Sequence, residues 1–238
     1  MKRRIKMTID LTVEQLANKI DHTLLKADAQ EAAFEKLCQE ARAYGFKMVA
    51  INSAPVTLCK KLLRDSPVHV GAAIGFPLGQ TTIQTKVFET REAIKNGADE
   101  IDYVINLSKL KDGNDKYIEE EMQTIVDICK KENILSKVIL ETCYLTDDEK
   151  KKVCEIAKEV QPDFVKTTTG FGSAGATVAD VKLMKEVVGD KVKVKAAGGI
   201  RDLKTAKDML EAGADRLGMS SSVKVIEEYR AERAQLDG

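Results

Sequence analysis

Short apolar runs rich in β-branched residues alternate with longer amphipathic stretches along the chain. The clearest runs are residues 47–51, 69–74, 100–105, 137–140, 164–166 and 192–195, and weaker ones lie at 20–24 and 215–218. Runs of this length and composition are typical of buried strands. The pattern therefore predicts eight strands.

The stretches between these runs carry helical patterns with recognisable ends. Thr146 and Glu149 have the spacing of a capping box, and apolar residues then recur at helical spacing over 153–160. Gly97 and Gly213 each stop a helical pattern, and both continue as Gly-Ala-Asp into the next predicted strand. The repeated tripeptide indicates that one kind of helix-to-strand connection is used twice.

The predicted strands recur about every 28 residues, which suits a strand-plus-helix unit. Eight such units favour an α/β fold of the (β/α)8 TIM-barrel type with an extra N-terminal helix, and an open doubly wound sheet is the alternative. No linker or composition shift divides the chain, so residues 1–238 are expected to form a single domain. In such a barrel, the C-terminal ends of the strands carry the chemistry.

Composition and charge narrow the class of protein. The 238 residues include 38 Lys+Arg and 38 Asp+Glu, so no overall field favours nucleic acid or an anionic membrane as a partner. Five cysteines form no C-x-x-C pair and the two histidines are far apart, so neither a disulfide framework nor a metal site is predicted. No apolar signal-peptide core follows the basic residues 1–6, and the uncharged stretch 66–85 is too polar to span a bilayer. A cytoplasmic protein is expected.

Two lysines fall near the C-terminal ends of consecutive predicted strands, Lys166 and Lys195. A buried ammonium group is costly unless it is paired or deprotonated, and a second cation nearby lowers its pKa. A neutral lysine amine is the nucleophile that forms a Schiff base with a carbonyl substrate. One such lysine would more often reach to solvent, but two on neighbouring strands favour a catalytic role.

Strand alternation adds a carboxylate to this pair. Asp102 has the opposite parity to Ile101 and Tyr103, so it points into the barrel if the apolar side chains face the helices. A carboxylate beside two lysines can act as a general acid/base, although the spacing equally allows a structural ion pair. Lys193 shares its parity with Lys195, and the pattern gives it no role.

Glycine- and serine-rich loops follow the last two predicted strands. Gly198, Gly199 and Arg201 follow the seventh strand. Ser220 and Ser221 follow the eighth. Exposed backbone N–H groups and hydroxyls near a helix start can hold an anion, and barrel enzymes often bind phosphate at these loops. Either loop alone could be an ordinary turn, but together they predict a phosphate site.

Residues 170–175 match the G-x-G-x-x-G pattern of dinucleotide-binding proteins. A dinucleotide site also needs an acidic residue at the end of the next strand. That strand ends in Lys-Ala-Ala at 195–197, so a nicotinamide site is rejected.

Six motifs in order make the chain similar to the deoxyribose-phosphate aldolase family, and the resemblance covers about residues 11–225. They are Asp-His-Thr-Leu-Leu-Lys at 21–26, Gly-Phe-Pro-Leu-Gly at 75–79, Glu-Ile-Asp-Tyr-Val-Ile-Asn at 100–106, Lys-Val-Ile-Leu-Glu-Thr at 137–142, Phe-Val-Lys-Thr-Thr-Thr-Gly-Phe at 164–171 and Val-Lys-Ala-Ala-Gly-Gly-Ile-Arg at 194–201. The resemblance implies a (β/α)8 barrel and a class I lyase without metal or organic cofactor. It implies cleavage of 2-deoxy-D-ribose 5-phosphate to glyceraldehyde 3-phosphate and acetaldehyde. The implied partners are thus small sugar phosphates and aldehydes, with a homo-oligomer possible.

The same resemblance assigns roles to residues. It places the Schiff-base lysine at Lys166, the lysine that lowers its pKa and relays protons at Lys195, and the general acid/base at Asp102, with Asp21 extending the polar network. The implied phosphate-binding residues are Gly170, Gly198, Gly199, Ser220 and Ser221, with Arg201 nearby.

Some positions depart from the family pattern, and alternative functions stay open. Ala50 replaces a cysteine that many members carry, Ala197 replaces a serine beside the phosphate loop, and Met219 and Ser222 alter the last loop. One alternative is another Schiff-base sugar-phosphate lyase or a transaldolase. The other is a barrel that binds a phosphate ligand without catalysis.

Overall fold

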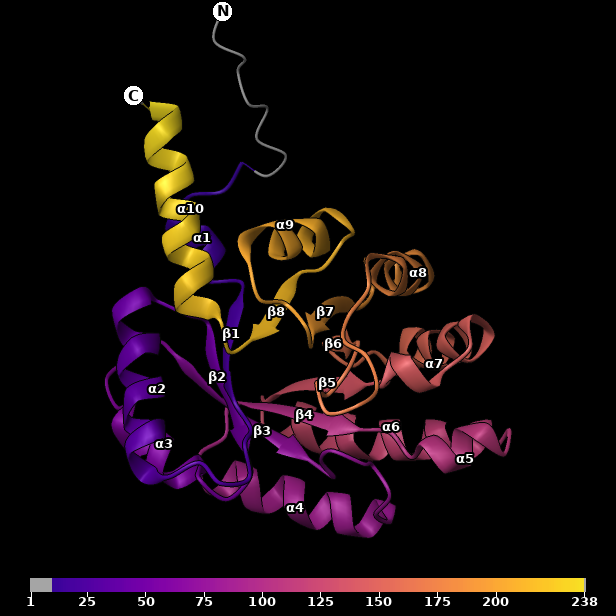
Figure 1. Ribbon diagram of the computed structural model, residues 1–238. Coiled ribbons are helices and arrows are strands. Elements are labelled where there is room, and N and C mark those ends of the chain that lie inside the picture. The colour runs from indigo at the N-terminus through magenta and orange to yellow at the C-terminus, as the bar shows by residue number, and fades with distance from the viewer. Residues whose placement is uncertain (1–9, 238) are drawn as a thin grey trace, which may run out of the picture.

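Eight parallel strands close into one barrel in the order β1 to β8, so the barrel prediction is confirmed and the open sheet is wrong. The computed structural model describes residues 10–237, and the basic segment 1–6 lies outside them. Figure 1 shows the strands at the centre and the helices around them. The strands are β1 (Ile20–Leu24), β2 (Met48–Asn52), β3 (His69–Ile74), β4 (Glu100–Val104), β5 (Leu135–Ile139), β6 (Phe164–Lys166), β7 (Lys193–Ala197) and β8 (Arg216–Met219).

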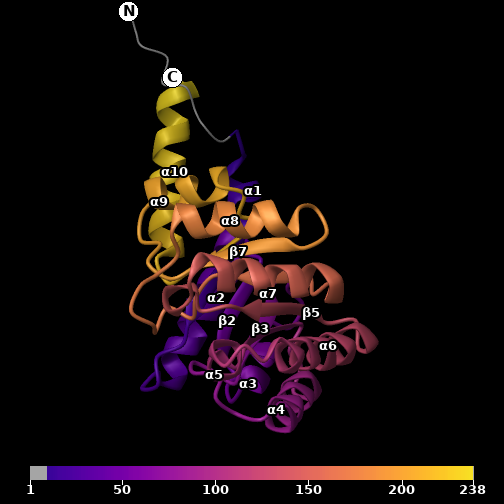
Figure 2. The ribbon, with the colours of Figure 1, turned by 90° about the vertical axis from the view of Figure 1, so that its right-hand side faces the viewer.

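Helices connect the strands and cover the outside of the barrel. They are α1 (Val13–Ala17), α2 (Glu31–Tyr44), α3 (Val56–Leu62), α4 (Ile83–Lys95), α5 (Leu107–Lys111), α6 (Asp115–Lys131), α7 (Asp147–Val160), α8 (Val178–Val188), α9 (Leu203–Glu211) and α10 (Ser222–Asp237), with a short 3₁₀ turn at Thr142–Tyr144. The expected extra N-terminal helix is α1, which packs beside α10 (Figures 1 and 2).

The repeated Gly-Ala-Asp connection has one structure at both places. Gly97 and Gly213 follow α4 and α9 with φ of 106° and 110°, a region that disfavours other residues. In each case the following aspartate accepts a hydrogen bond from the preceding strand, Asp99 from the N–H of Val70 and Asp215 from the N–H of Val194. These carboxylates therefore secure the N-terminal ends of β3 and β7.

Strand alternation sorts the side chains into two environments. Ile101, Tyr103 and Val165 face outward and are fully buried in the hydrophobic core against the helices. The inward positions of β4 and β6 hold Asp102 and Lys166, which contact each other inside the barrel. The hydrophobic core thus lies between the strands and the helices, and the charged side chains lie inside the barrel.

The strand ends differ from the predicted runs by one or two residues. β5 starts at Leu135 and β7 continues to Ala197. The assignment of residues 1–238 to a single domain stays a prediction. No helix within residues 10–237 combines the length and apolar character needed to cross a bilayer.

Candidate active site

The register of β6 and β7 brings the two predicted lysines together. Lys166 and Lys195 are paired across the two strands, so both side chains enter the barrel at the same level. Both are buried, with Lys166 only 4% exposed. Their ammonium nitrogens share one carboxylate, since Asp102 Oδ2 lies 3.0 Å from Lys166 Nζ and 2.7 Å from Lys195 Nζ.

A third lysine, which the sequence reasoning missed, occupies the other oxygen of Asp102. Lys137 Nζ donates to Asp102 Oδ1 at 2.6 Å and lies 2.5 Å from Glu100 Oε2. Lys195 in turn has a second carboxylate, since its Nζ lies 2.6 Å from Asp21 Oδ2. Arg216 closes the network by contacting both Asp21 and Glu100.

The buried part of this network, among the described residues, contains four cationic groups and three carboxylates, and the partly exposed His69 ring contacts it at its edge, with Nδ1 2.7 Å from Glu100 Oε1. The cations belong to Lys137, Lys166, Lys195 and Arg216, and the carboxylates to Asp21, Glu100 and Asp102. Lys137 and Lys195 each touch two carboxylates, whereas Lys166 has only a share of Asp102. Loss of one proton makes the positive and negative charges of the buried groups equal in number. Lys166 has the fewest carboxylate contacts of the three lysines, so it is the one expected to lose that proton most easily.

The direction of each pKa shift follows from these contacts. Burial lowers the pKa of Lys166, the positive charge of Lys195 lowers it further, and Asp102 opposes them only in part, which leaves a pKa of about 8. Burial would also lower the pKa of Lys137, but Asp102 and Glu100 outweigh it and raise that pKa. For Asp102, the three lysines outweigh burial and hold its pKa well below the ordinary value. Lys166 is therefore the amine that can act as a nucleophile near neutral pH.

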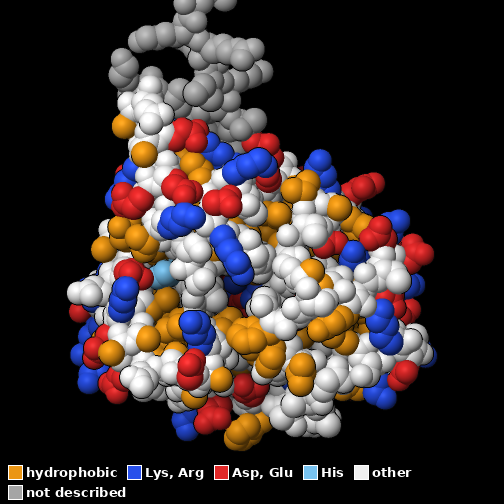
Figure 3. Space-filling view, viewed as in Figure 1, with side chains coloured by type: hydrophobic (Ala, Val, Ile, Leu, Met, Phe, Trp, Pro, Cys, Tyr) orange, Lys and Arg blue, Asp and Glu red, His pale blue; other side chains and the backbone are white. Residues whose placement is uncertain are grey.

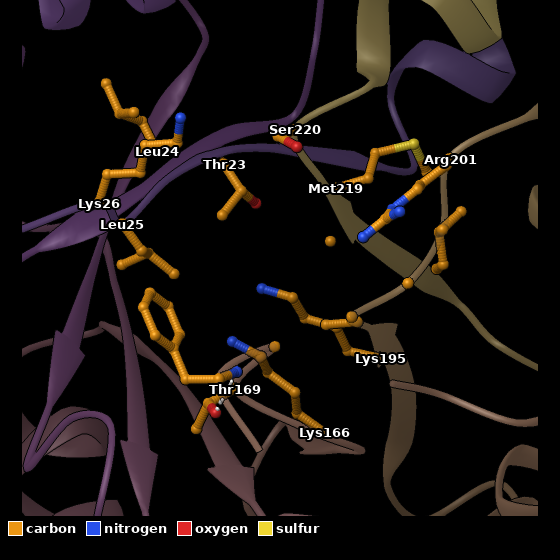
Figure 4. A pocket seen from close by; sticks show the side chains of 17 residues that line it. Thr23, Leu24, Leu25, Lys26, Lys166, Thr169, Lys195, Arg201, Met219 and Ser220 are labelled. Carbon is orange, nitrogen blue, oxygen red and sulfur yellow. Dashed lines mark hydrogen bonds between the residues drawn. The ribbon is translucent and has the colours of Figure 1, made fainter. Parts of the chain in front are cut away.

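A cavity of about 300 Å³ opens above these lysines at the C-terminal end of the barrel. In Figure 4, the Nζ atoms of Lys166 and Lys195 point into it from β6 and β7. Arg201, Met219 and Ser220 line another part of its wall. In Figure 3, this face is hollowed near its middle, with Lys or Arg side chains at the edge and hydrophobic side chains beside them.

Most of the predicted phosphate residues line this cavity. They are Gly170, Gly198, Gly199, Arg201 and Ser220. Ser221 is outside the lining and immediately precedes α10, where its carbonyl accepts the Val225 N–H. The cavity also includes Lys26, Thr169 and Phe171, which the sequence reasoning did not select.

Two glycine positions explain how the cavity is shaped. A Cβ at Gly218 would lie 3.1 Å from Lys195 Cε, so glycine leaves room for that side chain in the barrel. A Cβ at Gly175 would lie 2.4 Å from the Gly198 carbonyl oxygen. The G-x-G-x-x-G match at 170–175 thus reflects close packing between the β6–α8 and β7–α9 loops.

Glu141 fastens the β6–α8 loop and was also missed by the sequence reasoning. It is buried with a left-handed φ of 54°, and its carboxylate accepts the backbone N–H of Thr169 at 3.0 Å and the Thr169 hydroxyl. Its chain neighbours are tied to β6, since Leu140 N–H donates to the Lys166 carbonyl and Thr142 N–H to the Thr167 carbonyl. These hydrogen bonds hold Glu141 in its left-handed conformation next to the β6 segment that carries Lys166.

The remaining lysine of β7 lies at the other end of the barrel. Lys193 is exposed, and its Nζ lies 5.6 Å from the centre of the Phe164 ring. Parity could have identified Glu100 and Lys137, because both belong to the same inward-facing set as Asp102. Within residues 10–237, no cluster of His, Cys, Asp or Glu side chains has an arrangement that could hold a metal ion.

A closed (β/α)8 barrel with a buried, readily deprotonated lysine at the C-terminal end defines a barrel enzyme suited to amine chemistry on carbonyl compounds. Comparison with known families agrees, since the DeoC/LacD family aldolase model matches residues 9–226. The chain belongs to this aldolase family, and it is therefore a lyase.

Individual relatives match nearly the whole chain. The deoxyribose-phosphate aldolase of Lactobacillus acidophilus is 58% identical over 216 residues, covering 91% of each chain. That of Bacteroides thetaiotaomicron is 58% identical over 221 residues, covering 93% of each chain. Among solved structures, the deoxyribose-phosphate aldolase of Aeropyrum pernix is 32% identical, has a TM-score of 0.87 and covers 93% of each chain.

Proposed function

We propose that this aldolase cleaves 2-deoxy-D-ribose 5-phosphate reversibly to D-glyceraldehyde 3-phosphate and acetaldehyde through a Schiff base on Lys166. The observation that carries the proposal is the position of Lys166, which faces the cavity with the weakest carboxylate support of the three lysines that contact Asp102. The names of the relatives that match over nine-tenths of the chain support the substrate.

In the proposed reaction, the neutral amine of Lys166 attacks the aldehyde carbon of the open-chain sugar, and loss of water gives an iminium ion. Removal of the C3 hydroxyl proton breaks the C2–C3 bond, and the bonding electrons move into the iminium to give an enamine. Glyceraldehyde 3-phosphate leaves, C2 of the enamine takes a proton, and water releases acetaldehyde and the free amine. Every step conserves electrons without an external oxidant.

Asp102 and Lys195 are the proposed proton carriers. Their atoms lie 2.7 Å apart, and Asp102 also touches Lys166, so protons can pass within one hydrogen-bonded group. Asp21 holds Lys195 from the opposite side and extends this network.

The loop residues Gly170, Gly198, Gly199, Arg201 and Ser220 are the proposed phosphate site. They line the same cavity as the Lys166 and Lys195 amines and offer N–H groups, a hydroxyl and a guanidinium. We keep Ser221 in this group through its backbone at the start of α10. Binding energy from the remote phosphate would then orient the reacting carbons.

Reductive trapping tests the covalent step. Borohydride added with acetaldehyde should leave a two-carbon adduct that peptide mass mapping locates on Lys166. An intact protein without that adduct would refute the proposal. Activity on sugar phosphates of other chain lengths, with none on 2-deoxyribose 5-phosphate, would instead indicate another Schiff-base lyase or a transaldolase, and binding without cleavage would indicate a non-catalytic barrel.

We also propose a cytoplasmic homo-oligomer. All five cysteines are free and four of them are buried, which fits a reducing compartment. The Aeropyrum pernix aldolase is described as having a unique tetrameric structure, and Leu78 and Phe88 expose large apolar side chains here. A monomeric mass in light scattering would contradict self-association.

A further inference from the structure

His22 makes a connected set of hydrogen bonds that the reaction does not explain. It lies on β1 with its side chain outside the barrel, only 4% exposed. Its Nδ1 is 2.9 Å from Ser222 Oγ, and its Nε2 is 2.9 Å from Glu40 Oε2 on α2. The ring also packs on Phe46, with 5.0 Å between the ring centroids.

This serine–histidine–glutamate arrangement is not a hydrolytic site. Ser222 is fully buried, and its hydroxyl also lies 3.0 Å from the Met219 carbonyl oxygen, to which it can donate. A nucleophilic serine needs access to substrate, and this one faces the barrel wall behind the cavity. The arrangement is therefore a structural link between β1, α2 and α10 rather than a second active site.

The link holds both ends of the two-residue connection between β8 and α10. Met219 is paired with His22 across β8 and β1, and Ser222, the first residue of α10, is hydrogen-bonded to the His22 ring. Between them lie only Ser220 and Ser221, the serines of the proposed phosphate site. A displacement of the His22 ring would therefore move the serine connection directly.

The start of α10 also supports the second phosphate loop. Lys224 Nζ, in the first turn of α10, donates to the Arg201 carbonyl at 3.2 Å. Glu228 accepts the Leu203 N–H at 2.8 Å at the beginning of α9. Fixing the first turn of α10 thus fixes both loops that line this side of the cavity.

The hydrogen-bond chemistry assigns a defined tautomer to the ring. The Glu40 carboxylate can only accept, so Nε2 carries a hydrogen and Nδ1 of the neutral ring is an acceptor. The one hydrogen of the Ser222 hydroxyl is shared between Nδ1 and the Met219 carbonyl oxygen, which lie 2.9 and 3.0 Å from Ser222 Oγ. Burial lowers the pKa of His22 while Glu40 opposes this, and Lys36 on α2 is the other charged group near the ring. The neutral ring is thus the form that burial favours.

We propose that His22 is a positioning residue that fixes the β8–α10 connection and so determines how well the site binds the substrate phosphate. This inference rests on the proposed function, because it concerns the phosphate of that substrate. It assigns His22 no contact with the reacting carbons.

Steady-state kinetics on two substrates test the proposal. His22→Phe keeps a ring against Phe46 but removes both hydrogen bonds, and Ser222→Ala removes the contact on α10. Both variants lose the hydrogen bond between His22 and Ser222. Each should therefore raise KM for 2-deoxyribose 5-phosphate about 3- to 10-fold, the effect of losing that one hydrogen bond, with kcat nearly unchanged. The kcat/KM for unphosphorylated 2-deoxyribose should stay at the wild-type value. His22→Asn, whose side-chain amide can still reach Ser222, should restore much of the phosphate affinity.

Thr146→Ala is the matched control, because it removes the hydroxyl that caps α7, away from the cavity. It should lower thermal stability without changing either substrate's KM. Equal losses on both sugars, or an unchanged KM in His22→Phe, would overturn the positioning role. If the wild type itself did not prefer the phosphorylated sugar, the proposed function would fail, which is a separate outcome.

Discussion

Two buried lysines with lowered pKa values, Lys86 and Lys166, differ in the features that would make an amine reactive. Lys86 is fully buried between the barrel and its helices, where its Nζ lies 2.5 Å from Glu121 Oε1 and 2.6 Å from the Val104 carbonyl oxygen. Burial lowers its pKa, and burial also raises the pKa of Glu121. Lys166 is nearly as buried, yet it faces the cavity.

The difference lies in the partners and in access. Lys86 has a carboxylate of its own, and it lies outside the lining of the cavity that Lys166 faces. Lys166 shares Asp102 with two other lysines, so its proton is weakly held. Because the amine also faces the cavity, a substrate carbon could reach it once that proton is lost. A lowered pKa alone therefore does not distinguish the two lysines, whereas the neighbouring cation and the open cavity support Lys166 as the proposed nucleophile.

The largest expected effect comes from removing the reactive amine. Lys166→Ala should abolish turnover and borohydride trapping, because the covalent intermediate has no other attachment point. The remaining Lys86 should not substitute for it, since substrate cannot reach that amine. Activity assays combined with intact-mass measurement check this, and an adduct on Lys86 would contradict the distinction between the two lysines.

The second effect separates the cation beside Lys166 from the amine itself. Lys195→Met should reduce kcat by about 10²–10⁴-fold through loss of a proton carrier. It also removes a positive charge, so the pKa of Lys166 should rise above about 8 and less of the amine should be neutral at a given pH. The acid limb of the kcat/KM profile should therefore move to higher pH.

Lys193→Met is the matched control for that profile, because Lys193 lies on the same strand at the exposed end of the barrel. Its acid limb should coincide with that of the wild type. If Lys195→Met left the acid limb in place, the pKa of Lys166 would be set by burial alone.

The third prediction concerns stability rather than chemistry. Lys86→Met leaves the Glu121 carboxylate buried without its cation, which should lower the free energy of unfolding by about 3–5 kcal/mol. The kcat of the folded enzyme should not change. Urea unfolding and active-site titration measure the two quantities, and adding Glu121→Met should recover part of the stability. A fall in kcat per folded molecule would show that this pair does influence the reaction.

The same comparison shows what the sequence could and could not predict. The eight strands and the inward-facing positions of Lys166, Lys195 and Asp102 follow from local patterns, because alternation and spacing are properties of neighbouring residues. The ion pairs do not follow, since Lys137 meets Asp102 through strand register and Arg216 meets Asp21 across the barrel closure. Closure brings together residues nearly 200 positions apart, as in the contact between Arg216 and Asp21.

Glu141 was unpredictable for a different reason. Its role depends on a left-handed backbone conformation that glycine or asparagine would normally signal, and a glutamate at that position gives no such signal. The cavity-lining Phe171 and Lys26 are likewise ordinary loop residues until the loops are placed around the barrel mouth.

The smallest expected effect extends the comparison to two buried carboxylates. Glu121 is paired with Lys86, whereas Glu141 is held in the described chain by the Thr169 N–H and hydroxyl and by a Cys143 Sγ contact at 3.9 Å. Glu141→Gln keeps the shape but removes the negative charge, so the charge-assisted hydrogen bonds to Thr169 in the β6–α8 loop become weaker. KM for the sugar phosphate should rise about 3- to 10-fold with kcat nearly unchanged.

Thr169→Ser retains the hydroxyl and should behave like the wild type, whereas Thr169→Val should resemble Glu141→Gln. A large fall in kcat instead would mean that Glu141 acts on Lys166 itself, through the Leu140 and Thr142 hydrogen bonds to β6.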